Sequence, residues 1–343
     1  MIDTAAVSTE AVAQVRVRGL TVVYRTEYGE LPAVSNANID LRAGEITGLV
    51  GESGSGKSTL ALSLLNGIRP PGRISAGTIE VGGIGSVLDL GKEALRHARG
   101  GTLGYVFQAS QNSLNPLKTI GKQLLDLGRS HGVPEPRSLI SEARDLATQM
   151  GMDAERVITS YQHQLSGGMR QRIGIIFALV LNAKVLLLDE PTTALDMLSQ
   201  AAVLDIVKRV HTERNLATLI VTHDMGVVAE LADRLAVMYG GRIVEDGPAR
   251  DVLRRPEHPY TRALIRATPR IIGDIDTAQA LPGRPPALTT VPRRGCVFRE
   301  RCPLAMDVCA GVEPELIEWE PGRHRACYAD LAGETDTPTG AAQ

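Results

Sequence analysis

The segment Gly51-Glu52-Ser53-Gly54-Ser55-Gly56-Lys57-Ser58 decides the fold of this 343-residue chain. It fits the pattern G-x-x-x-x-G-K-[ST] and stands between the apolar run Glu45–Val50 and an apolar helical stretch at Thr59–Leu65. A buried strand, a glycine-rich turn and a helix in this order form a cradle for phosphate, because curled backbone N–H groups and the helix N-terminus face the anion. The octet alone could be a simple glycine-rich turn, but its flanks favour the phosphate site.

The residues of this loop have distinct expected contacts with a nucleotide. The ammonium group of Lys57 is expected to reach the β- and γ-phosphates, and the Ser58 hydroxyl is expected to ligate Mg²⁺. The remaining residues would surround the phosphates through their backbone N–H groups. The predicted nucleotide-binding residues of the loop are Gly51, Ser53, Gly54, Ser55, Gly56, Lys57, Ser58 and Thr59.

A second nucleotide element follows at Val185-Leu186-Leu187-Leu188-Asp189-Glu190. Its four apolar residues predict a buried strand, which places Asp189 at the carboxyl end, where α/β folds bind ligands. We expect Asp189 to hold the Mg²⁺ shell and Glu190 to polarise an attacking water. By itself the segment would fit equally well a strand that ends in an acidic cap, and the phosphate loop favours the catalytic interpretation.

Strand and helix signals alternate over the first 250 residues and fade afterwards. An edge-type strand pair is expected at Val15–Arg18 and in the run that ends at Tyr24, and buried strands flank a predicted helix near Ser199–Arg214. We therefore predict a flexible tail at 1–14, an α/β domain at 15–250, a second domain at 251–330 and a flexible tail at 331–343. Further strands are expected at Thr78–Val81, Val185–Leu188, Leu219–Thr222, Arg234–Met238 and Arg242–Glu245.

Length and charge narrow the class of protein. The length suits about two domains, and 37 Lys and Arg against 39 Asp and Glu give a net charge of -2. A nucleic-acid scaffold would show a basic excess, so this near-neutral balance argues against one. The first residues lack the basic and apolar segments of a signal peptide, and no apolar run reaches the ~18 uninterrupted residues needed to cross a bilayer. We therefore expect a reducing, cytoplasmic environment.

Between the two nucleotide elements lies Leu165-Ser166-Gly167-Gly168-Met169-Arg170-Gln171-Arg172, a Ser-Gly-Gly turn that opens a helix and offers a second anion site. This segment resembles the signature motif of ATP-binding cassette (ABC) proteins. Other parts of that family's pattern match in order: Gln108 resembles the Q-loop, Ala194-Leu195-Asp196 resembles the D-loop, and His223 resembles the switch histidine.

The resemblance implies an ABC-type P-loop NTPase: a RecA-like parallel sheet core, an antiparallel β-subdomain and a helical subdomain at about residues 109–180. It also implies that two cassettes close head to tail around ATP, and that Tyr24 stacks on the adenine, with Tyr28 as the alternative. The resemblance implies that Glu190 is the general base, with His223 and Gln108 as further catalytic residues, and that the Mg²⁺ ligands are Ser58, Gln108 and Asp189. It also implies that the ATP bound by the partner subunit is contacted by Ser166, Gly167, Gly168 and Gln171. Asp196 is the implied functional residue of the D-loop.

Four segments outside the general motifs indicate a subfamily. They are Asn112–Pro116, His258–Leu264, Leu281–Gly283 and the block from Cys296 to Cys327. Together they resemble the ATPase subunits of bacterial dipeptide/oligopeptide importers, a group that includes nickel uptake systems. The resemblance implies that ATP hydrolysis drives import of di- or oligopeptides, with nickel or another small solute as the alternative cargo, and that a C-terminal accessory domain carries the cysteines.

The same resemblance implies the partners and the location. These are a second ABC ATPase subunit, identical or different, two integral-membrane permease subunits and an extracytoplasmic solute-binding protein, with this chain at the cytoplasmic face of the inner (cell) membrane and no nucleic acid bound. The alternative class is a soluble ABC protein of translation or DNA repair. One cassette, and only 58 positions from Gln108 to Ser166, argue against it. The signature motif disfavours a generic P-loop kinase.

All four cysteines of the chain lie in one block, Cys296-x5-Cys302-x6-Cys309-x17-Cys327. In a reducing compartment such clustering favours metal over disulfides. The spacing matches neither a zinc ribbon nor a bacterial ferredoxin and leaves Zn(Cys)₄, an Fe–S cluster and free structural thiols open. Similarity to the peptide-importer ATPases favours a 4Fe–4S cluster on all four cysteines, with zinc as the alternative and nearby His324 as a spare ligand.

Overall fold

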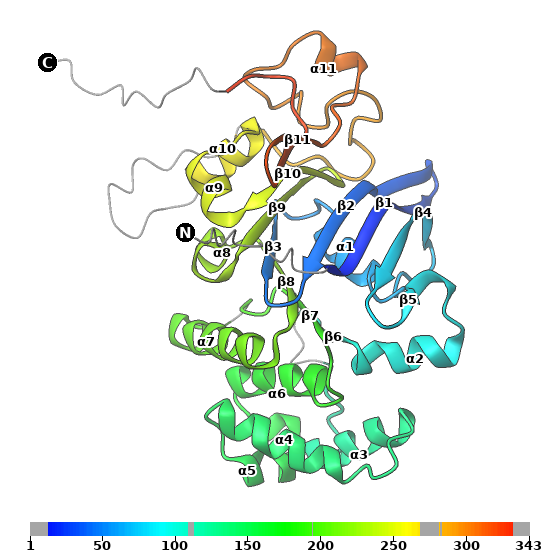
Figure 1. Ribbon diagram of the computed structural model, residues 1–343, viewed down its shortest axis with the longest axis vertical. Coiled ribbons are helices and arrows are strands. Elements are labelled where there is room, and N and C mark those ends of the chain that lie inside the picture. Colours follow the sequence, from blue (N-terminus) through cyan, green and yellow to red (C-terminus); the bar gives the residue numbers. More distant parts are fainter. Residues whose placement is uncertain (1–12, 109–112, 194, 268–280, 282, 332–343) are drawn as a thin grey trace, which may run out of the picture.

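The computed structural model describes residues 13–108, 113–193, 195–267, 281 and 283–331, which form two β-sheets flanked by helices (Figure 1). The predicted tails therefore fall almost entirely outside the described residues. Two of their boundaries differ from the prediction. The first strand already includes Ala13 and Gln14, and Leu331 is only 3% exposed, so these residues belong to the folded part.

An eight-stranded sheet in the order β11-β12-β10-β9-β3-β8-β7-β6 forms the centre of the molecule. β3 (Ile46–Val50) pairs in parallel with β8 (Ala217–Thr222) and with β9 (Arg234–Tyr239). β8 pairs in parallel with β7 (Val185–Asp189), which pairs in parallel with β6 (Leu103–Val106). Every residue of β3, β7 and β8 is buried, as expected for parallel strands covered on both faces. The predicted α/β fold is confirmed.

A four-stranded antiparallel sheet, β2-β1-β4-β5, packs beside the first. The prediction of an edge-type strand pair was wrong, because β1 (Ala13–Thr26) is one continuous strand that pairs with both of its neighbours. Its period-two pattern reflects one face buried on the core and one face toward solvent, a pattern that edge and central antiparallel strands share. The other strands of this sheet are β2 (Gly29–Arg42), β4 (Gly72–Val81) and β5 (Gly85–Ser86).

The helices divide into a group that flanks the sheets and a group that forms a separate layer. In Figure 1 the helices of that layer, α3 to α6, lie at the bottom, and residues 109–112 of the predicted helical subdomain lie outside the described residues. The first helix begins at Lys57, two residues before the prediction. The bounds are α1 (Lys57–Ser63), α2 (Lys92–Gly101), α3 (Ile120–Ser130), α4 (Ser138–Gln149), α5 (Ala154–Thr159), α6 (Gly167–Leu179), α7 (Met197–Arg214), α8 (Met225–Leu231), α9 (Ala249–Arg254), α10 (Pro259–Arg266) and α11 (Val308–Gly311).

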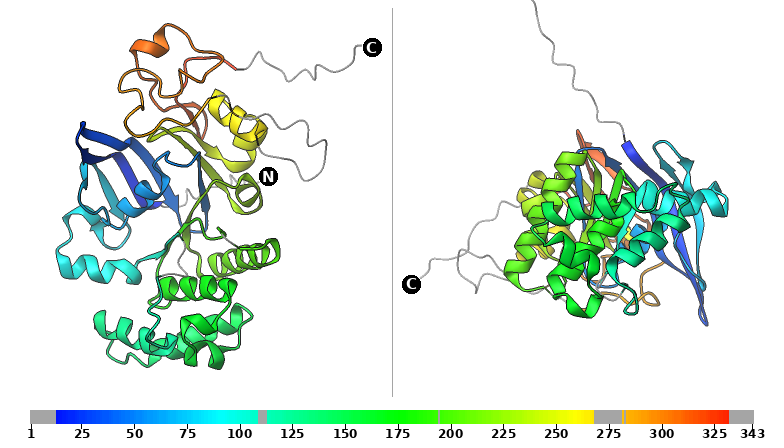
Figure 2. Two further views of the ribbon diagram at one scale, coloured as in Figure 1. Left: turned by 180° about the vertical axis from the view of Figure 1, so that it is seen from behind. Right: turned by 90° about the horizontal axis from the view of Figure 1, so that it is seen from below.

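The C-terminal region does not form an independent body after residue 250. Its strands β11 (Ile317–Glu320) and β12 (Arg323–Arg325) extend the large sheet, because β12 pairs with β10 (Arg242–Pro248). A shared core joins the two parts, in which the Phe298 ring packs against Tyr239 and Tyr260 at centroid distances of 5.1 and 5.4 Å. Figures 1 and 2 show this region at the opposite end of the molecule from α3 to α6.

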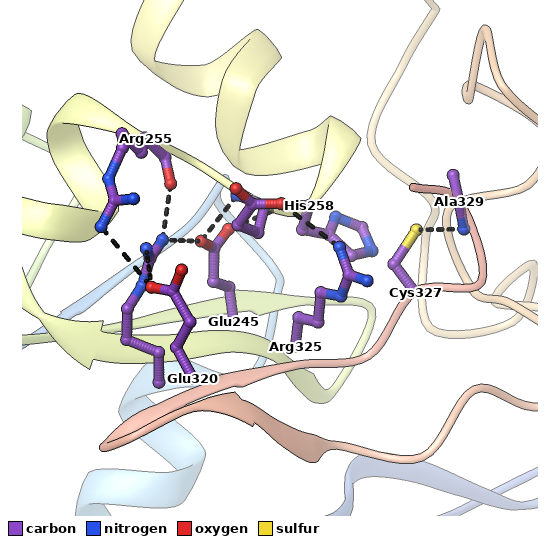
Figure 3. A network of polar contacts seen from close by, with 9 residues as sticks. Glu245, Arg255, His258, Glu320, Arg325, Cys327 and Ala329 are labelled. Carbon is purple, nitrogen blue, oxygen red and sulfur yellow. Dashed lines mark hydrogen bonds and ion pairs between the residues drawn. The ribbon is translucent and has the colours of Figure 1, made fainter. Parts of the chain in front are cut away.

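A buried polar network connects the C-terminal region to the α/β domain (Figure 3). The Glu245 carboxylate on β10 accepts hydrogen bonds from the backbone N–H groups of Glu257 (2.8 Å) and His258 (3.0 Å). From β12, the guanidinium of Arg323 donates to the Arg255 carbonyl at 2.6 Å, and that of Arg325 donates to the Glu257 carboxylate at 3.2 Å. The network therefore ties β10, the start of α10 and β12 together.

Two buried groups of this network respond to pH in opposite directions. Burial lowers the pKa of His258 to about 3, and its neutral Nδ1 accepts the N–H of Tyr260 at 3.1 Å to cap α10. Burial raises the pKa of Glu245 to about 7. The unfolded chain binds a proton at His258 below its ordinary pKa while the folded chain does not, so this residue lowers stability as the pH falls below about 6.5. Glu245 opposes that loss as the pH falls from about 7.

We predict that His258→Asn becomes more stable relative to the parent as the pH falls. Asn keeps a side-chain acceptor for the helix cap but cannot titrate. The difference in free energy of unfolding between variant and parent should shift in the variant's favour by up to about 1.4 kcal/mol per pH unit below about pH 6.5. Urea unfolding at several pH values between about 5 and 8 measures it.

Glu245→Gln is the matched control, because it should shift with the opposite sign: the variant gains on the parent as the pH rises from about 4.5 to about 7. A difference between His258→Asn and the parent that stays constant over the whole pH range would contradict the assignment of a neutral buried imidazole.

Candidate functional site

The phosphate loop packs closely against the backbone at Ala33 and Met238. Gly51 and Gly56 adopt φ angles of 155° and 101°. A Cβ on Gly51 would lie 2.1 Å from the carbonyl oxygen of Met238, and one on Gly56 would lie 2.3 Å from that of Ala33. These two positions therefore require glycine for space, and Gly56 also requires it for its left-handed backbone. The tight turn ends directly in α1, which places Lys57 at the first helical position.

Lys57 is folded back over the loop. Its Nζ donates hydrogen bonds to the carbonyls of Gly51 (2.7 Å) and Glu52 (2.9 Å) and to the Ser55 hydroxyl (3.3 Å). Burial lowers the pKa of Lys57, while the carboxylates of Glu190, Asp189 and Glu52 favour its charged form. The three carboxylates keep the ammonium group charged, and a charged ammonium group directed into a glycine-rich turn is suited to bind a polyphosphate.

Asp189 lies next to Ser58, so the structure brings the two predicted nucleotide elements together. The Ser58 hydroxyl donates to Asp189 Oδ1 at 3.0 Å, and the Tyr105 hydroxyl donates to Oδ2 at 2.9 Å. Burial raises the pKa of Asp189 and of Tyr105. Sequence reasoning did not find Tyr105, although it lies on β6, three residues before Gln108, and pairs with Leu187 on the adjacent strand β7.

Glu190 is held by side chains from three segments. Gln108 Nε2 donates to Glu190 Oε2 at 2.8 Å, the Thr193 hydroxyl donates to the same oxygen at 3.0 Å, and His223 Nδ1 lies 3.3 Å from Oε1. Glu190 itself has a left-handed backbone with φ 49°. The structure thus brings the three predicted catalytic residues together and adds Thr193, which the sequence motifs did not single out.

The signature segment lies beside the D-loop. Ser166 caps α6 by accepting the N–H of Met169 at 3.3 Å, and Asp196 caps α7 through the N–H and hydroxyl of Ser199 at 2.9 and 2.7 Å. These hydrogen bonds lower the pKa of Asp196. A Cβ on Gly168 would lie 3.5 Å from the Ser199 hydroxyl, so the two helix starts adjoin each other. Gly167 begins α6, and Gln171 is buried on it.

The two candidate adenine-stacking residues differ in environment. Tyr24 lies on β1 and is half-buried, with its ring against Gly72 and the core of the small sheet. Tyr28 lies in the β1–β2 turn with 69% of its surface exposed.

The four cysteines surround one small pocket, which Phe298, Leu304 and Pro314 also line. All four are free, and burial raises the pKa of the thiols of Cys296, Cys302 and Cys327, that of Cys302 to about 11. In the described part of the chain, no three His, Cys, Asp or Glu side chains are arranged to hold a metal ion. The predicted 4Fe–4S or zinc site is therefore not seen as a formed coordination sphere, although four cysteines around one pocket are the donor type that a thiolate-ligated group requires.

Within the described residues, no helix combines the length and the apolar character that crossing a bilayer would require.

Comparison with known proteins places these features in a family. Residues 34–193 match the family described as "ABC transporter", and residues 244–309 match "Oligopeptide/dipeptide transporter, C-terminal region". Among solved structures, a dimeric bacterial ABC transporter cassette, MJ0796, is 25% identical with a TM-score of 0.59, over 69% of this chain and 99% of that one. The cbiO1 protein of Clostridium perfringens, part of the ABC transporter complex cbiONQ, is 25% identical with a TM-score of 0.60, over 71% and 91% of the two chains.

Curated relatives match over most of their length. A putative peptide import ATP-binding protein of Brucella melitensis is 43% identical over 88% of this chain and 92% of its own. The oligopeptide transport ATP-binding protein OppD of Escherichia coli is 39% identical over 93% and 94%, and the dipeptide transport protein DppD of the same organism is 37% identical over 93% and 97%. With the phosphate loop, the signature segment and the C-terminal region in place, the chain belongs to the ABC family, among the ATP-binding subunits of peptide importers.

Proposed function

We propose that this chain binds and hydrolyses ATP to drive the import of di- or oligopeptides through a membrane complex. The observation that carries the proposal is the position of Glu190, whose carboxylate is fixed by Gln108, Thr193 and His223 next to the Asp189–Ser58 pair. The names of the curated relatives support peptides as the cargo.

The residues of the site divide the work of phosphoryl transfer. Glu190 is the general base that orients and deprotonates the attacking water, and His223 contacts the γ-phosphate from the adjacent strand end. Lys57 and the loop N–H groups hold the β- and γ-phosphates, and Tyr24 stacks on the adenine. Such a site accelerates hydrolysis by position and electrostatics rather than by a covalent intermediate.

Magnesium fits the oxygen donors of this site. Ser58, Asp189 and Gln108 are the residues that would hold it, and hydroxyl, carboxylate and amide oxygens are the ligands that Mg²⁺ prefers. When bound, the ion neutralises phosphate charge. The Tyr105 hydroxyl contributes by fixing one oxygen of the Asp189 carboxylate, which leaves the Ser58-facing oxygen oriented toward the loop.

A second ATPase subunit completes each site. Ser166, Gly167, Gly168 and Gln171 lie at the start of α6 and would contact the ATP held by the partner, with Asp196 at the adjoining helix start. The dimeric form of a solved relative supports this arrangement. The complete importer then contains two permease subunits and an extracytoplasmic solute-binding protein, with this chain at the cytoplasmic face of the membrane.

The cysteine block is proposed to hold a 4Fe–4S cluster. The four cysteines that line one pocket supply the ligand count of such a cluster, and the raised pKa values of three of the thiols mean that binding must displace their protons. Zinc is the alternative occupant, because four thiolates also suit a tetrahedral ion.

Glu190→Gln is predicted to bind ATP normally and to hydrolyse it at least ~10²-fold more slowly, because the general base is lost while the phosphate cradle is intact. Phosphate release and nucleotide affinity are measured on the assembled transporter. Glu213→Gln, on the exposed side of α7, is the matched control and should behave as the parent. Near-normal turnover of Glu190→Gln would remove this residue from the general-base role.

Transport is tested on proteoliposomes that contain the whole complex. We predict ATP-dependent uptake of a labelled dipeptide or oligopeptide, lost in Lys57→Ala because the phosphates lose their cation. Uptake of Ni²⁺ without uptake of peptide would show that the transported solute is nickel rather than a peptide. Co-purification with ribosomes or DNA and without integral-membrane partners would contradict the transport function.

The cluster is tested on protein purified without oxygen. We predict a brown protein with broad absorption near ~400 nm and stoichiometric iron and sulfide. Cys302→Ser should lower the iron content, because the cluster loses one thiolate. Thr290→Ser, at an exposed position on the preceding segment, is the control and should keep the colour. A colourless protein with one zinc per chain would decide for the alternative.

A further inference from the structure

The C-terminal region makes a direct contact with the phosphate loop. Glu52, the second residue of that loop, forms a two-pronged ion pair with Arg301: one guanidinium nitrogen donates to Oε2 at 2.6 Å and the other to Oε1 at 3.1 Å. The side chains are only 7% and 19% exposed for Arg301 and Glu52. A bidentate pair with so little solvent access fixes both the position and the orientation of the carboxylate.

The backbone of the same loop residue is held from the C-terminal region as well. The N–H of Glu52 donates to the hydroxyl of Tyr260 at 2.9 Å. Tyr260 is fully buried, and its ring packs against Tyr239 and Phe298 at centroid distances of 4.6 and 5.4 Å. Because this aromatic cluster fixes the ring, the hydroxyl is a rigid acceptor for the loop.

Arg301 is itself anchored by the same cluster. Its guanidinium lies 5.6 Å from the centre of the Tyr239 ring and 6.0 Å from that of Phe298, and it donates to the Tyr239 hydroxyl at 3.3 Å. Although burial acts to lower the pKa of Arg301, its hydrogen bonds to Glu52 and Tyr239 raise it, so the guanidinium stays charged at every working pH. Two residues that pack in this aromatic cluster, Arg301 and Tyr260, therefore both hydrogen-bond Glu52 of the phosphate loop.

The charge of Glu52 gives this contact a consequence for nucleotide binding. Glu52 is one of the carboxylates that act electrostatically on Lys57, whose ammonium group bonds the Glu52 carbonyl. Without Arg301, that carboxylate would be an uncompensated anion at the mouth of a site for phosphate, and it would also be free to turn.

We propose that Arg301 and Tyr260 are positioning residues of the nucleotide site, which hold Glu52 so that the phosphate loop is shaped for ATP and the Glu52 charge is neutralised. The C-terminal region then contributes two residues that position the phosphate loop of the ATPase site. This inference rests on the proposed function for its ligand, ATP, but not on transport or on the general-base role of Glu190.

The experiment measures ATP affinity and turnover separately in the assembled complex. Arg301→Gln should weaken ATP binding by about 10-fold, roughly the effect of one lost charged partner. The double variant Glu52→Gln with Arg301→Gln should recover most of that affinity, because the unpaired carboxylate is gone. Tyr260→Phe should weaken binding by a few-fold, since the Glu52 N–H loses its acceptor. Exposed Arg293→Gln is the matched control on the same segment and should bind ATP as the parent does.

The outcomes separate positioning from general stability. Thermal unfolding checks that each variant is folded. Folded Arg301→Gln with parental ATP affinity would overturn the proposal, as would a double variant that binds no better than Arg301→Gln, because a purely structural role predicts no recovery. If the parent binds ATP but the complex imports no peptide, the proposed transport fails while the positioning result stands.

Discussion

The parallel pairing of three buried strands is the constraint on which the site depends. Val50 at the end of β3 lies opposite Thr222 of β8, and Asp189 at the end of β7 lies opposite Val221. The chain therefore leaves all three strands at one edge of the sheet, and the phosphate loop, Glu190 and His223 follow there directly. Sheet register, rather than any single side-chain contact, brings segments that are distant in the sequence into one site.

Three carboxylates lie at the same edge of the sheet, and their negative charges require partners. Asp189, Glu190 and Glu52 all act on the single ammonium group of Lys57. Each carboxylate has its own partners: hydroxyls of Ser58 and Tyr105 for Asp189, Gln108 and Thr193 for Glu190, and the guanidinium of Arg301 for Glu52. Among these partners only Arg301 brings a permanent positive charge, and it pairs with Glu52, the one of the three carboxylates for which no catalytic or metal-binding role is proposed. The three carboxylates of this edge therefore differ in the chemical type of their partners: hydroxyls for Asp189, an amide and a hydroxyl for Glu190, and a guanidinium for Glu52.

The sequence predicted the parallel core and its motifs well because both are local. A run of four apolar residues before Asp189 and a glycine octet before α1 specify strand, turn and helix within a few residues. The sequence-based prediction was wrong for features that depend on which strands pair with each other. Period-two alternation in Val15–Tyr24 could not distinguish an edge pair from one central strand. The fading of strand and helix signals after residue 250 suggested a domain boundary, which the pairing of β12 with β10 crosses. The four cysteines were found, but spacing alone could not give their arrangement.

The link between Glu52 and Arg301 shows why such a contact escapes motif analysis. The pattern G-x-x-x-x-G-K-[ST] leaves position 52 unspecified, and its partner lies 249 positions away in a segment without regular secondary structure. What makes the contact possible is the extension of the sheet past residue 250, since β12 and the Tyr239–Tyr260–Phe298 cluster bring that segment against the phosphate loop. The accessory region thus shares a sheet and a core with the cassette and contacts its phosphate loop through Arg301 and Tyr260. The cysteine pocket shares Phe298 with this aromatic cluster and includes Cys302, the residue after Arg301, so it packs directly against the residues that contact the phosphate loop.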